Sequence, residues 1–253
     1  MLETIHHDAI VELRLARPPV NALDPALVGA LREAIEAAPA QGARAIVLSG
    51  RPDLYSGGLD VPALLHLDRP ALAAFLTEFF ELCGTIACSP IPIVAAITGH
   101  SPAGGAVLSI FCDYRVMARG EYRIGLNEVQ VGLAVPAVIQ YTLKRLIGAH
   151  KAERLMVAGA MIDSAEAQRV GFVDELVDVD HVVTRSIEWC KHLLALPPEA
   201  MAETRRMARA DLHAELDAAQ GFSHEEFIAR WFSDESQSVL KALVAKLKSK
   251  APA

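Results

Sequence analysis

A single glutamate, Glu128, stands in a segment that is otherwise largely apolar. Its neighbours in sequence include Ile124, Leu126 and Val131. An apolar environment withdraws water from a carboxylate, and this raises its pKa towards the range of a useful general base. The alternative interpretation of one isolated glutamate is a surface or salt-bridged side chain. The segment by itself therefore indicates a candidate base and leaves its role open.

A turn of small residues earlier in the chain is the second candidate for chemistry. The run 93–97 is short, apolar and flanked by proline, which predicts a buried strand. Residues 101–105, SPAGG, then form a turn, and the apolar run 106–111 predicts a short buried helix. Such a turn places backbone N–H groups without intrahelical partners at a helix N-terminus, where a developing anion is stabilised. Close backbone packing is the alternative role of the two glycines.

The same turn also suggests a different enzyme class, a serine hydrolase. Ser101 follows His100 in GHSPA, which looks a little like a nucleophile elbow with His100 or His150 as the base. In that design the residue after the nucleophile donates an N–H to the oxyanion. Here that residue is Pro102, which has no N–H, so the sequence disfavours a hydrolase.

Three motifs together resemble the crotonase (enoyl-CoA hydratase/isomerase) superfamily: PAGG at 102–105, CDYR at 112–115 and IGLNEVQVG at 124–132. The likeness covers nearly the whole chain and is greatest to the Δ3-Δ2-enoyl-CoA isomerases of fatty-acid β-oxidation. It implies an α/β fold, the crotonase-like (ClpP/crotonase) spiral of repeated ββα units, with a C-terminal helical region that packs into a trimer. It also implies an acyl-CoA substrate and no metal or redox cofactor, because CoA enters as part of the substrate.

The resemblance assigns roles to several positions. Glu128 becomes the catalytic base, and the Gly104 N–H becomes one donor of an oxyanion hole. The second donor is the Leu59 N–H, in the loop YSGGLD at 55–60, which resembles the F-S-x-G-L-D form of the isomerases. The same loop would line the acyl-thioester pocket with Gly57, Gly58, Asp60 and Val61. As a pattern alone this loop is a glycine-rich turn, and it is no phosphate-binding P-loop because the Lys-Ser/Thr ending is missing.

The number of acidic side chains in the site separates two reactions of the family, hydration and isomerisation. Its hydratases use two glutamates to activate and add water, whereas migration of a double bond needs only one base. One glutamate matches Glu128, and the other falls in the helix after the Gly-Gly turn, where this chain has Val107. A valine offers water no hydrogen bond. We therefore expect conversion of a 3-enoyl-CoA to a 2-enoyl-CoA. Hydration, or another crotonase-type acyl-CoA reaction, is the alternative, with Asp60 or Glu78 as a possible second acid.

An N-terminal loop also resembles its counterpart in the family. The segment RPPVNAL at 17–23 contains Arg17, which would approach the CoA phosphates. A solvated arginine is an equally good interpretation of this residue.

Composition narrows the remaining function classes. The 253 residues are 52% hydrophobic, which fits one or two domains with a sizeable core, and the net charge is −7. This acidic balance disfavours nucleic acid as a partner, and with it the RNA-binding role of some crotonase-like proteins. Scaffold roles are disfavoured because Glu128 and the loop glycines are both present. The four cysteines lack C-x-x-C spacing and are expected to be reduced core thiols rather than metal ligands: Cys83, Cys88, Cys112 and Cys190.

The predicted location is cytoplasmic, without membrane association. No run in the sequence approaches the length expected of a membrane helix. The start MLETIHHDAIVEL lacks the basic residues and apolar block of a signal peptide.

The elements that must position the candidate site follow from periodicity. Strands predicted at 11–15 and 44–49 flank a helix that Asp24 caps and Pro25 begins. Strand, helix and strand in this order indicate the crossover units of an α/β fold. The later part of the chain, from Asp180 onwards, is predicted to be helical throughout.

A break at Leu196-Pro197-Pro198 predicts the boundary between a core of residues 1–196 and a C-terminal helical region of residues 197–253. The last predicted helices span 223–232 and 234–248. They carry apolar side chains that a monomer would have difficulty covering: Phe227, Trp231, Phe232, Val239, Leu240 and Leu243. We therefore expect a homotrimer or a dimer of trimers.

Overall fold

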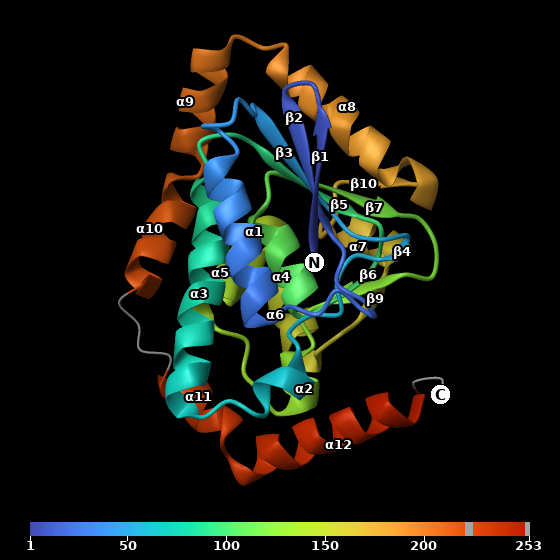
Figure 1. The fold of residues 1–253 in the computed structure, drawn as a ribbon, viewed down its shortest axis with the longest axis vertical. Helices are drawn as coiled ribbons and strands as arrows, with labels where there is room; N and C mark the ends of the chain where they lie inside the picture. Colours follow the sequence, from blue (N-terminus) through green and yellow to red (C-terminus); the bar gives the residue numbers. More distant parts are fainter. Residues whose placement is uncertain (221–224, 251–253) are drawn as a thin grey trace.

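The computed structural model describes residues 1–220 and 225–250, and its strands form two sheets (Figure 1). The larger, six-stranded sheet has the order β1 (Leu2–His7), β2 (Ile10–Leu15), β3 (Ala45–Ser49), β5 (Ile93–Ile97), β7 (Tyr114–Ala118) and β10 (Glu175–Val177). The four-stranded sheet has the order β4 (Asp53–Leu54), β6 (Gly99–Pro102), β8 (Arg123–Gly125) and β9 (Ile162–Asp163). The strands predicted at 11–15, 44–49 and 93–97 are confirmed as β2, β3 and β5.

Helices fill the intervals between these strands and make up the end of the chain. Those before β10 are α1 (Pro25–Ala37), α2 (Val61–Leu64), α3 (Arg69–Cys88), α4 (Gly104–Phe111), α5 (Ala137–Ile147), α6 (Ala149–Ala158) and α7 (Ser164–Val170). Those after it are α8 (Val182–Leu194), α9 (Pro198–Ala208), α10 (Ala210–Gln220), α11 (Glu225–Trp231) and α12 (Asp234–Lys250). Two short 3-10 helices are η1 (Glu128–Val131) and η2 (Val179–His181). Ser223, at the predicted start of one helix, lies outside the described residues.

The chain repeats one unit, in which a strand of the large sheet is followed by a short strand of the small sheet and then by helix. The units are β3–β4–α3, β5–β6–α4 and β7–β8–α5. Within each sheet the successive strands of these units pair in parallel, β3 with β5 and β5 with β7, and β4 with β6 and β6 with β8. The expected spiral of ββα units is therefore present.

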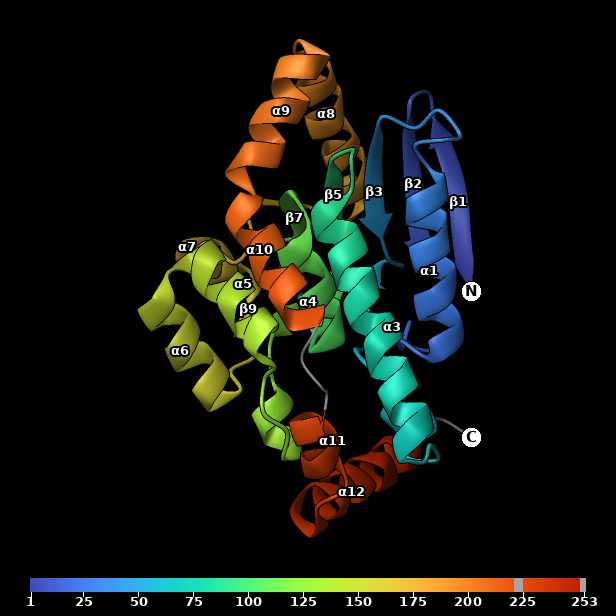
Figure 2. The same ribbon diagram turned by 90° about the vertical axis from the view of Figure 1, so that its left-hand side faces the viewer.

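Helices cover both faces of the large sheet, as parallel strands require. Along β3, Ile46 and Leu48 belong to the main core with α1 and α3, whereas Ala45 and Val47 pack on the side of α8. Figures 1 and 2 show α8 on one face and α1, α3 and α4 on the other. This arrangement buries every residue of the central strands β3 and β5, whereas the edge strand β1 stays partly exposed.

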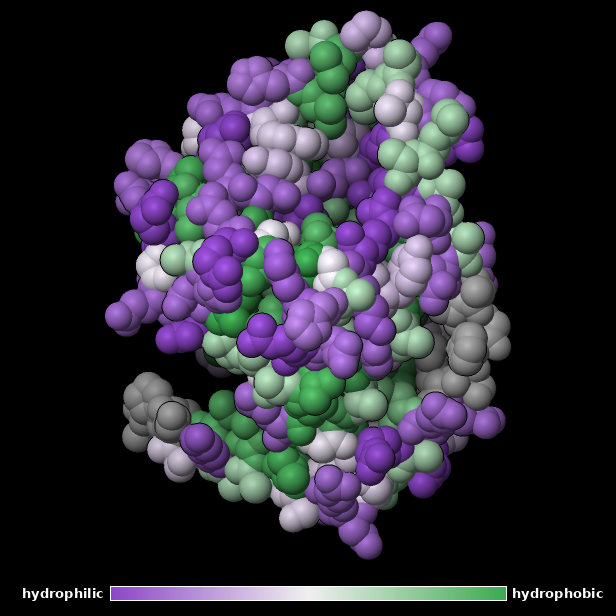
Figure 3. All heavy atoms as spheres, turned by 180° about the vertical axis from the view of Figure 1, so that it is seen from behind, coloured by the Kyte–Doolittle hydropathy of each residue, from purple (hydrophilic) through white to green (hydrophobic). Residues whose placement is uncertain are grey.

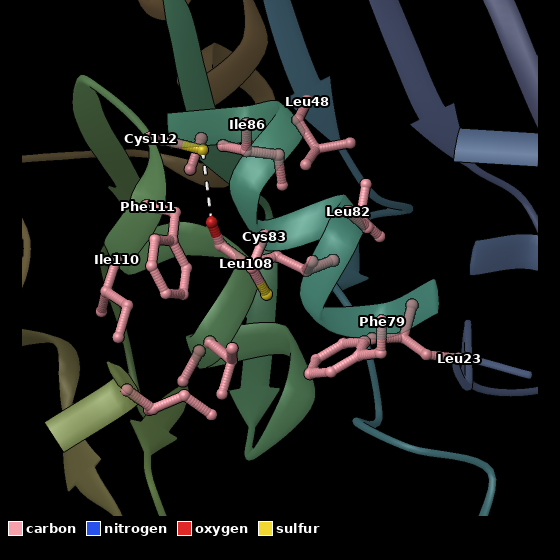
Figure 4. Close-up of a cluster of buried hydrophobic side chains, with 14 of the residues drawn as sticks. Leu23, Leu48, Phe79, Leu82, Cys83, Ile86, Leu108, Ile110, Phe111 and Cys112 are labelled. Carbon is pink, nitrogen blue, oxygen red and sulfur yellow. Dashed lines mark hydrogen bonds between the residues drawn. The ribbon is translucent and has the colours of Figure 1, made fainter. Parts of the chain in front are cut away.

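Helix α4 lies at the centre of the main core, where its buried side chains pack against α3. Figure 4 shows Leu108 of α4 beside Cys83 of α3, with Phe111 and Leu82 on either side of this pair. Burial raises the pKa of the neighbouring Cys112 thiol to about 12, so it stays protonated and unreactive. The prediction of reduced core thiols holds for Cys83, Cys112 and Cys190, which are free and buried, but it is wrong for Cys88, which is exposed at the end of α3.

Helix α3 differs from what the sequence predicted. Within the described residues, α3 is long and apolar enough to suit a membrane span by length and composition, although no such run was expected. Its residues Leu72, Phe75, Leu76 and Leu82 are buried in the main core. A core helix of this kind passes the same test, so this finding is weak evidence for a membrane.

The C-terminal helices pack onto this core instead of standing apart. Figure 2 shows α10 beside α3 and α5, and α12 packs against α2 and η1. The predicted boundary at residues 196 and 197 falls in the turn between α8 and α9. Trp231 and Leu240, which were expected to need a partner subunit, are 1% and 0% exposed within the single chain. The other apolar residues expected to need a partner are half-buried: Phe227, Phe232, Val239 and Leu243.

A buried charge cluster fastens α9 to the core. Arg205 donates to both carboxylate oxygens of Asp113, at 2.7 and 2.9 Å, and Arg209 donates to one of them at 3.0 Å. The same carboxylate accepts the N–H of Ile93 at 2.8 Å, at the start of β5. The three charged side chains are only 10–12% exposed. Asp113 therefore joins the large sheet to the C-terminal helices.

We expect Asp113→Ala to lower the free energy of unfolding by about 3 kcal/mol, because it leaves two buried guanidinium groups without their carboxylate. Urea denaturation of the whole chain measures this loss. The matched control is Glu203→Ala, which removes an exposed partner of Arg206 on the same helix and should change the midpoint very little. Equal midpoints for the two variants would contradict the role of Asp113.

Candidate active site

Two backbone N–H groups meet where the loop 55–60 crosses the start of α4. A β-carbon on Gly104 would lie 3.2 Å from the Leu59 nitrogen, and one on Gly58 would lie 3.3 Å from the Gly104 nitrogen. Gly58 also has φ +85°, a left-handed conformation that favours glycine. The two glycines therefore let the Leu59 and Gly104 N–H groups approach the same small space.

Neither N–H has an acceptor within the described part of the chain. Leu23 forms a parallel bridge with this loop: its N–H donates to the Gly58 carbonyl at 2.8 Å, and its carbonyl accepts the Asp60 N–H at 3.0 Å. The Leu59 N–H lies between these two bonds and therefore points away from Leu23. Gly104 is the first residue of α4, before the first bond from Val107 N–H to the Ala103 carbonyl. Both donors are free for a ligand oxygen, as the donors of an oxyanion hole must be.

Ala103 makes the sharp turn from β6 into α4. Its φ of +42° with ψ of −114° is rare for a residue with a β-carbon and costs on the order of 1–3 kcal/mol. Its N–H donates to the Gly125 carbonyl at 2.8 Å, which holds the turn against β8. The sequence did not predict this backbone conformation, because alanine carries no signal for positive φ.

A polar network holds the other loop. The Ser56 hydroxyl donates to the Asn21 carbonyl at 2.8 Å and accepts from Gly58 N–H at 3.1 Å. The Asn21 amide donates to the Tyr55 carbonyl at 3.1 Å, and Gly57 N–H donates to the Val20 carbonyl at 2.7 Å. Asn21 and Ser56 are buried supporting residues that sequence reasoning missed, since their partners lie far away in the chain.

Asp60 is fully engaged within this loop. One of its carboxylate oxygens caps α2 by accepting Ala63 N–H at 3.0 Å, and the other lies 2.8 Å from the Arg17 guanidinium. Arg17 also lies 2.9 Å from Asp24, the cap of α1. These ion pairs make Arg17 more than a solvated side chain, and its contact with the CoA phosphates stays a prediction. Val61 follows as the first residue of α2, with its N–H on the Leu59 carbonyl at 2.8 Å.

The pairing of β6 with β8 places Glu128 three residues beyond Gly125, the residue that lies against this turn. Pro102 pairs with Gly125, and the chain then continues through Leu126 into η1, whose first residue is Glu128. Its Oε2 is buried without a hydrogen-bond partner among the described residues. Burial raises the pKa of Glu128 from 4.5 to about 7, although its own backbone N–H opposes the shift. This is the raised pKa that the apolar sequence context predicted.

The other candidate acids are occupied. Glu78, on α3, is paired with Arg32 of α1 at 2.7 Å, and Asp60 is held as described above. Val107 is 1% exposed in α4 and carries no polar group. In the part of the chain that the structure describes, Glu128 is therefore the one carboxylate with a buried oxygen that lacks a partner.

The serine hydrolase alternative receives no support. The Ser101 hydroxyl is buried and lacks a hydrogen-bond partner within residues 1–220 and 225–250. His100 is exposed, and its Nδ1 accepts Arg123 N–H at 3.0 Å. No described base is therefore placed to activate this serine. Among the described residues, no group of three or more His, Cys, Asp or Glu side chains is placed to hold a metal ion.

Comparisons with known proteins point to one family. The family model described as enoyl-CoA hydratase/isomerase matches residues 6–250. The human mitochondrial enoyl-CoA delta isomerase 1 is 30% identical over 242 residues, which cover 94% of this chain and 80% of the human protein. A probable enoyl-CoA hydratase of Mycolicibacterium paratuberculosis is 31% identical over 218 residues, or 85% and 82% of the two chains. The crystal structure of human mitochondrial delta3-delta2-enoyl-CoA isomerase superposes with a TM-score of 0.93 at 28% identity, covering 99% of both chains.

The raised pKa of Glu128 predicts a pH-dependent stability. Between pH 4.5 and about 7 the folded protein holds this proton more tightly than the unfolded chain does, so stability falls as pH rises through that window. Above pH 7 the ionised, buried carboxylate costs about 3 kcal/mol. We therefore expect the stability of Glu128→Gln relative to the wild type to increase by about this amount between pH 4 and pH 8.

Denaturant titrations across this pH range measure the difference. The matched control is Glu33→Gln, which changes an exposed glutamate of α1 and should follow the wild-type curve at every pH. A constant difference between Glu128→Gln and the wild type from pH 4 to pH 8 would show that the carboxyl is not desolvated.

Proposed function

Because this chain belongs to the enoyl-CoA hydratase/isomerase family, we propose that it moves the double bond of a 3-enoyl-CoA to position 2, as in fatty-acid β-oxidation. One observation carries the proposal. Within the described residues, a single unpartnered carboxylate, Glu128, lies near a turn that presents two free N–H groups. This combination suits a reaction that moves one proton through an enolate.

In the first step the thioester carbonyl accepts hydrogen bonds from the Leu59 and Gly104 N–H groups. Glu128 removes a proton from C2, and the electrons of that C–H bond delocalise onto the carbonyl oxygen as an enolate. Each of the two donors stabilises the developing negative charge, typically by about 3–4 kcal/mol. The backbone of Gly57 and Gly58, together with Asp60 and Val61, shapes the pocket around the thioester.

In the second step the protonated Glu128 returns the proton to C4. The double bond then lies between C2 and C3, and the enzyme regains its starting state. A carboxyl group with a pKa of about 7 both accepts and donates this proton at neutral pH. The proposal needs no metal or redox cofactor, since CoA enters as part of the substrate.

The choice of isomerisation over hydration rests on residues, because relatives of both names are similarly close. Hydration needs a second polar group to hold water, and the matching position is occupied by the buried, apolar Val107. Asp60 and Glu78 are tied to Arg17 and Arg32. These contacts support one-base chemistry in a pocket from which water is excluded.

We also propose that the chain binds acyl-CoA and neither nucleic acid nor a membrane. It would assemble as a homotrimer or a dimer of trimers. The far half of α12 supports an assembly, because Leu243 and Val244 are half-buried and Leu247 is 50% exposed. Figure 3 shows apolar side chains along this lower arm of the molecule. The cytoplasmic location stays a prediction, and the similar human protein is named mitochondrial.

The decisive experiment offers a 3-enoyl-CoA and crotonyl-CoA separately and identifies the products by mass and ultraviolet absorbance. We expect isomerisation of the first and little hydration of the second. Glu128→Gln should bind acyl-CoA but lose turnover by on the order of 10²–10⁴-fold, because an amide accepts no proton from C2. The control Glu33→Gln should keep the turnover of the wild type. Rapid hydration of crotonyl-CoA would refute the isomerase, and near wild-type turnover of Glu128→Gln would refute the base.

Val107→Glu tests the missing second acid. We expect it to raise the hydration of crotonyl-CoA modestly, because the surrounding side chains do not hold a second carboxylate in place. Val107→Gln, which adds similar bulk without the acid, is the matched control and should not raise hydration. If the two variants hydrate crotonyl-CoA equally, the identity of residue 107 does not separate the two reactions.

A further inference from the structure

The short helix η1 that carries Glu128 is closed by Gly132. This residue has φ +76°, and its N–H points back to the carbonyls of Glu128 and Val129. Leu133 N–H also donates to the Glu128 carbonyl, at 3.1 Å. A single 3-10 turn has poor hydrogen-bond geometry of its own. The orientation of Glu128 therefore depends on what holds Gly132.

The first turn of α12 supplies that contact. The Ser236 hydroxyl donates to the Gly132 carbonyl at 2.8 Å, across 104 residues of sequence, and Ser236 is 0% exposed. A β-carbon on Gly132 would lie 3.1 Å from both the Cα and the Oγ of Ser236. Ser236 N–H in turn donates to the Ser233 hydroxyl at 3.3 Å, which fixes the start of α12. The two backbones are thus in close contact, and one hydrogen bond joins them.

A second contact holds the other side of η1. The Gln130 amide donates to the Gly159 carbonyl at 2.8 Å, at the end of α6. A β-carbon on Gly159 would lie 2.7 Å from Val129, so this packing is also close. With Gln130 in place, loss of the Ser236 contact leaves η1 attached on one side and free to tilt on the other.

We propose that Ser236 is a positioning residue for Glu128, acting through the Gly132 carbonyl to set the direction of the catalytic carboxylate. The inference rests on the proposed function, in which Glu128 is the base. A displacement of about 1 Å at a reacting group is enough to cost on the order of 10²-fold in rate. The C-terminal helix α12 thereby takes part in the chemistry without touching the reacting atoms.

Ser236→Thr and Ser236→Val test the proposal as a pair. Both add the same bulk at this buried position, but only threonine keeps the hydroxyl. We expect kcat to be about tenfold lower in Ser236→Val than in Ser236→Thr, with KM values within about twofold, because the variant changes orientation rather than binding. The control Ser238→Ala, at an exposed position of the same helix, should match the wild type.

The pKa of Glu128 gives a readout that does not depend on turnover. Carbon-13 NMR of glutamate-labelled protein measures it, with the Glu128 signal assigned by its absence in Glu128→Gln. We expect a lower pKa in Ser236→Val than in Ser236→Thr, because a tilted η1 admits water to the carboxylate. Equal kcat and equal pKa in the pair would overturn the role of Ser236. If Glu128→Gln keeps its turnover, the base assignment fails instead, whatever the pair shows.

Discussion

The burial of one carboxylate without a hydrogen-bond partner is the constraint on which the rest of this structure depends. An ionised Glu128 is costly in an apolar setting, and its pKa of about 7 expresses that cost. The chain must hold this residue in place against its tendency to reach water. It does so with backbone contacts at Gly132 and a side-chain amide at Gln130, neither of which neutralises the carboxylate. The carboxylate oxygen thus stays without a partner while the backbone that carries it is fixed.

Close approach of backbone segments exposes two N–H groups, whose partial positive charge suits an anion. Glycines at 58 and 104 and the strained Ala103 let two N–H groups face one space. Such donors are effective because they are already oriented before an anion develops. The supporting side chains, among them Asn21 and Ser56, use their hydrogen bonds to fix the loop backbone. The polar side chains of the loop are therefore used to hold its backbone, whereas the two backbone N–H groups are left without a partner.

Sequence patterns revealed the parts of this structure that local chemistry determines. The buried strand at 93–97, the Asp24 cap and the apolar setting of Glu128 were all predictable. The short strands of the small sheet were not, because two or three residues such as Asp53–Leu54 carry no periodicity and pair with distant partners. The ion pairs of Arg17 and the burial of Trp231 likewise depend on packing between distant segments.

The same dependence on distant contacts explains why the C-terminal helices belong to the site. Asp113 anchors α9 and α10 to the start of β5, and the chain then returns past α3 to place α12 against η1. Ser236 contacts Gly132 across 104 residues of sequence, so this hydrogen bond depends on how all of these helices pack. A glutamate from the middle of the chain thus has its backbone supported by helices from the end of the chain, the same helices that cover the core.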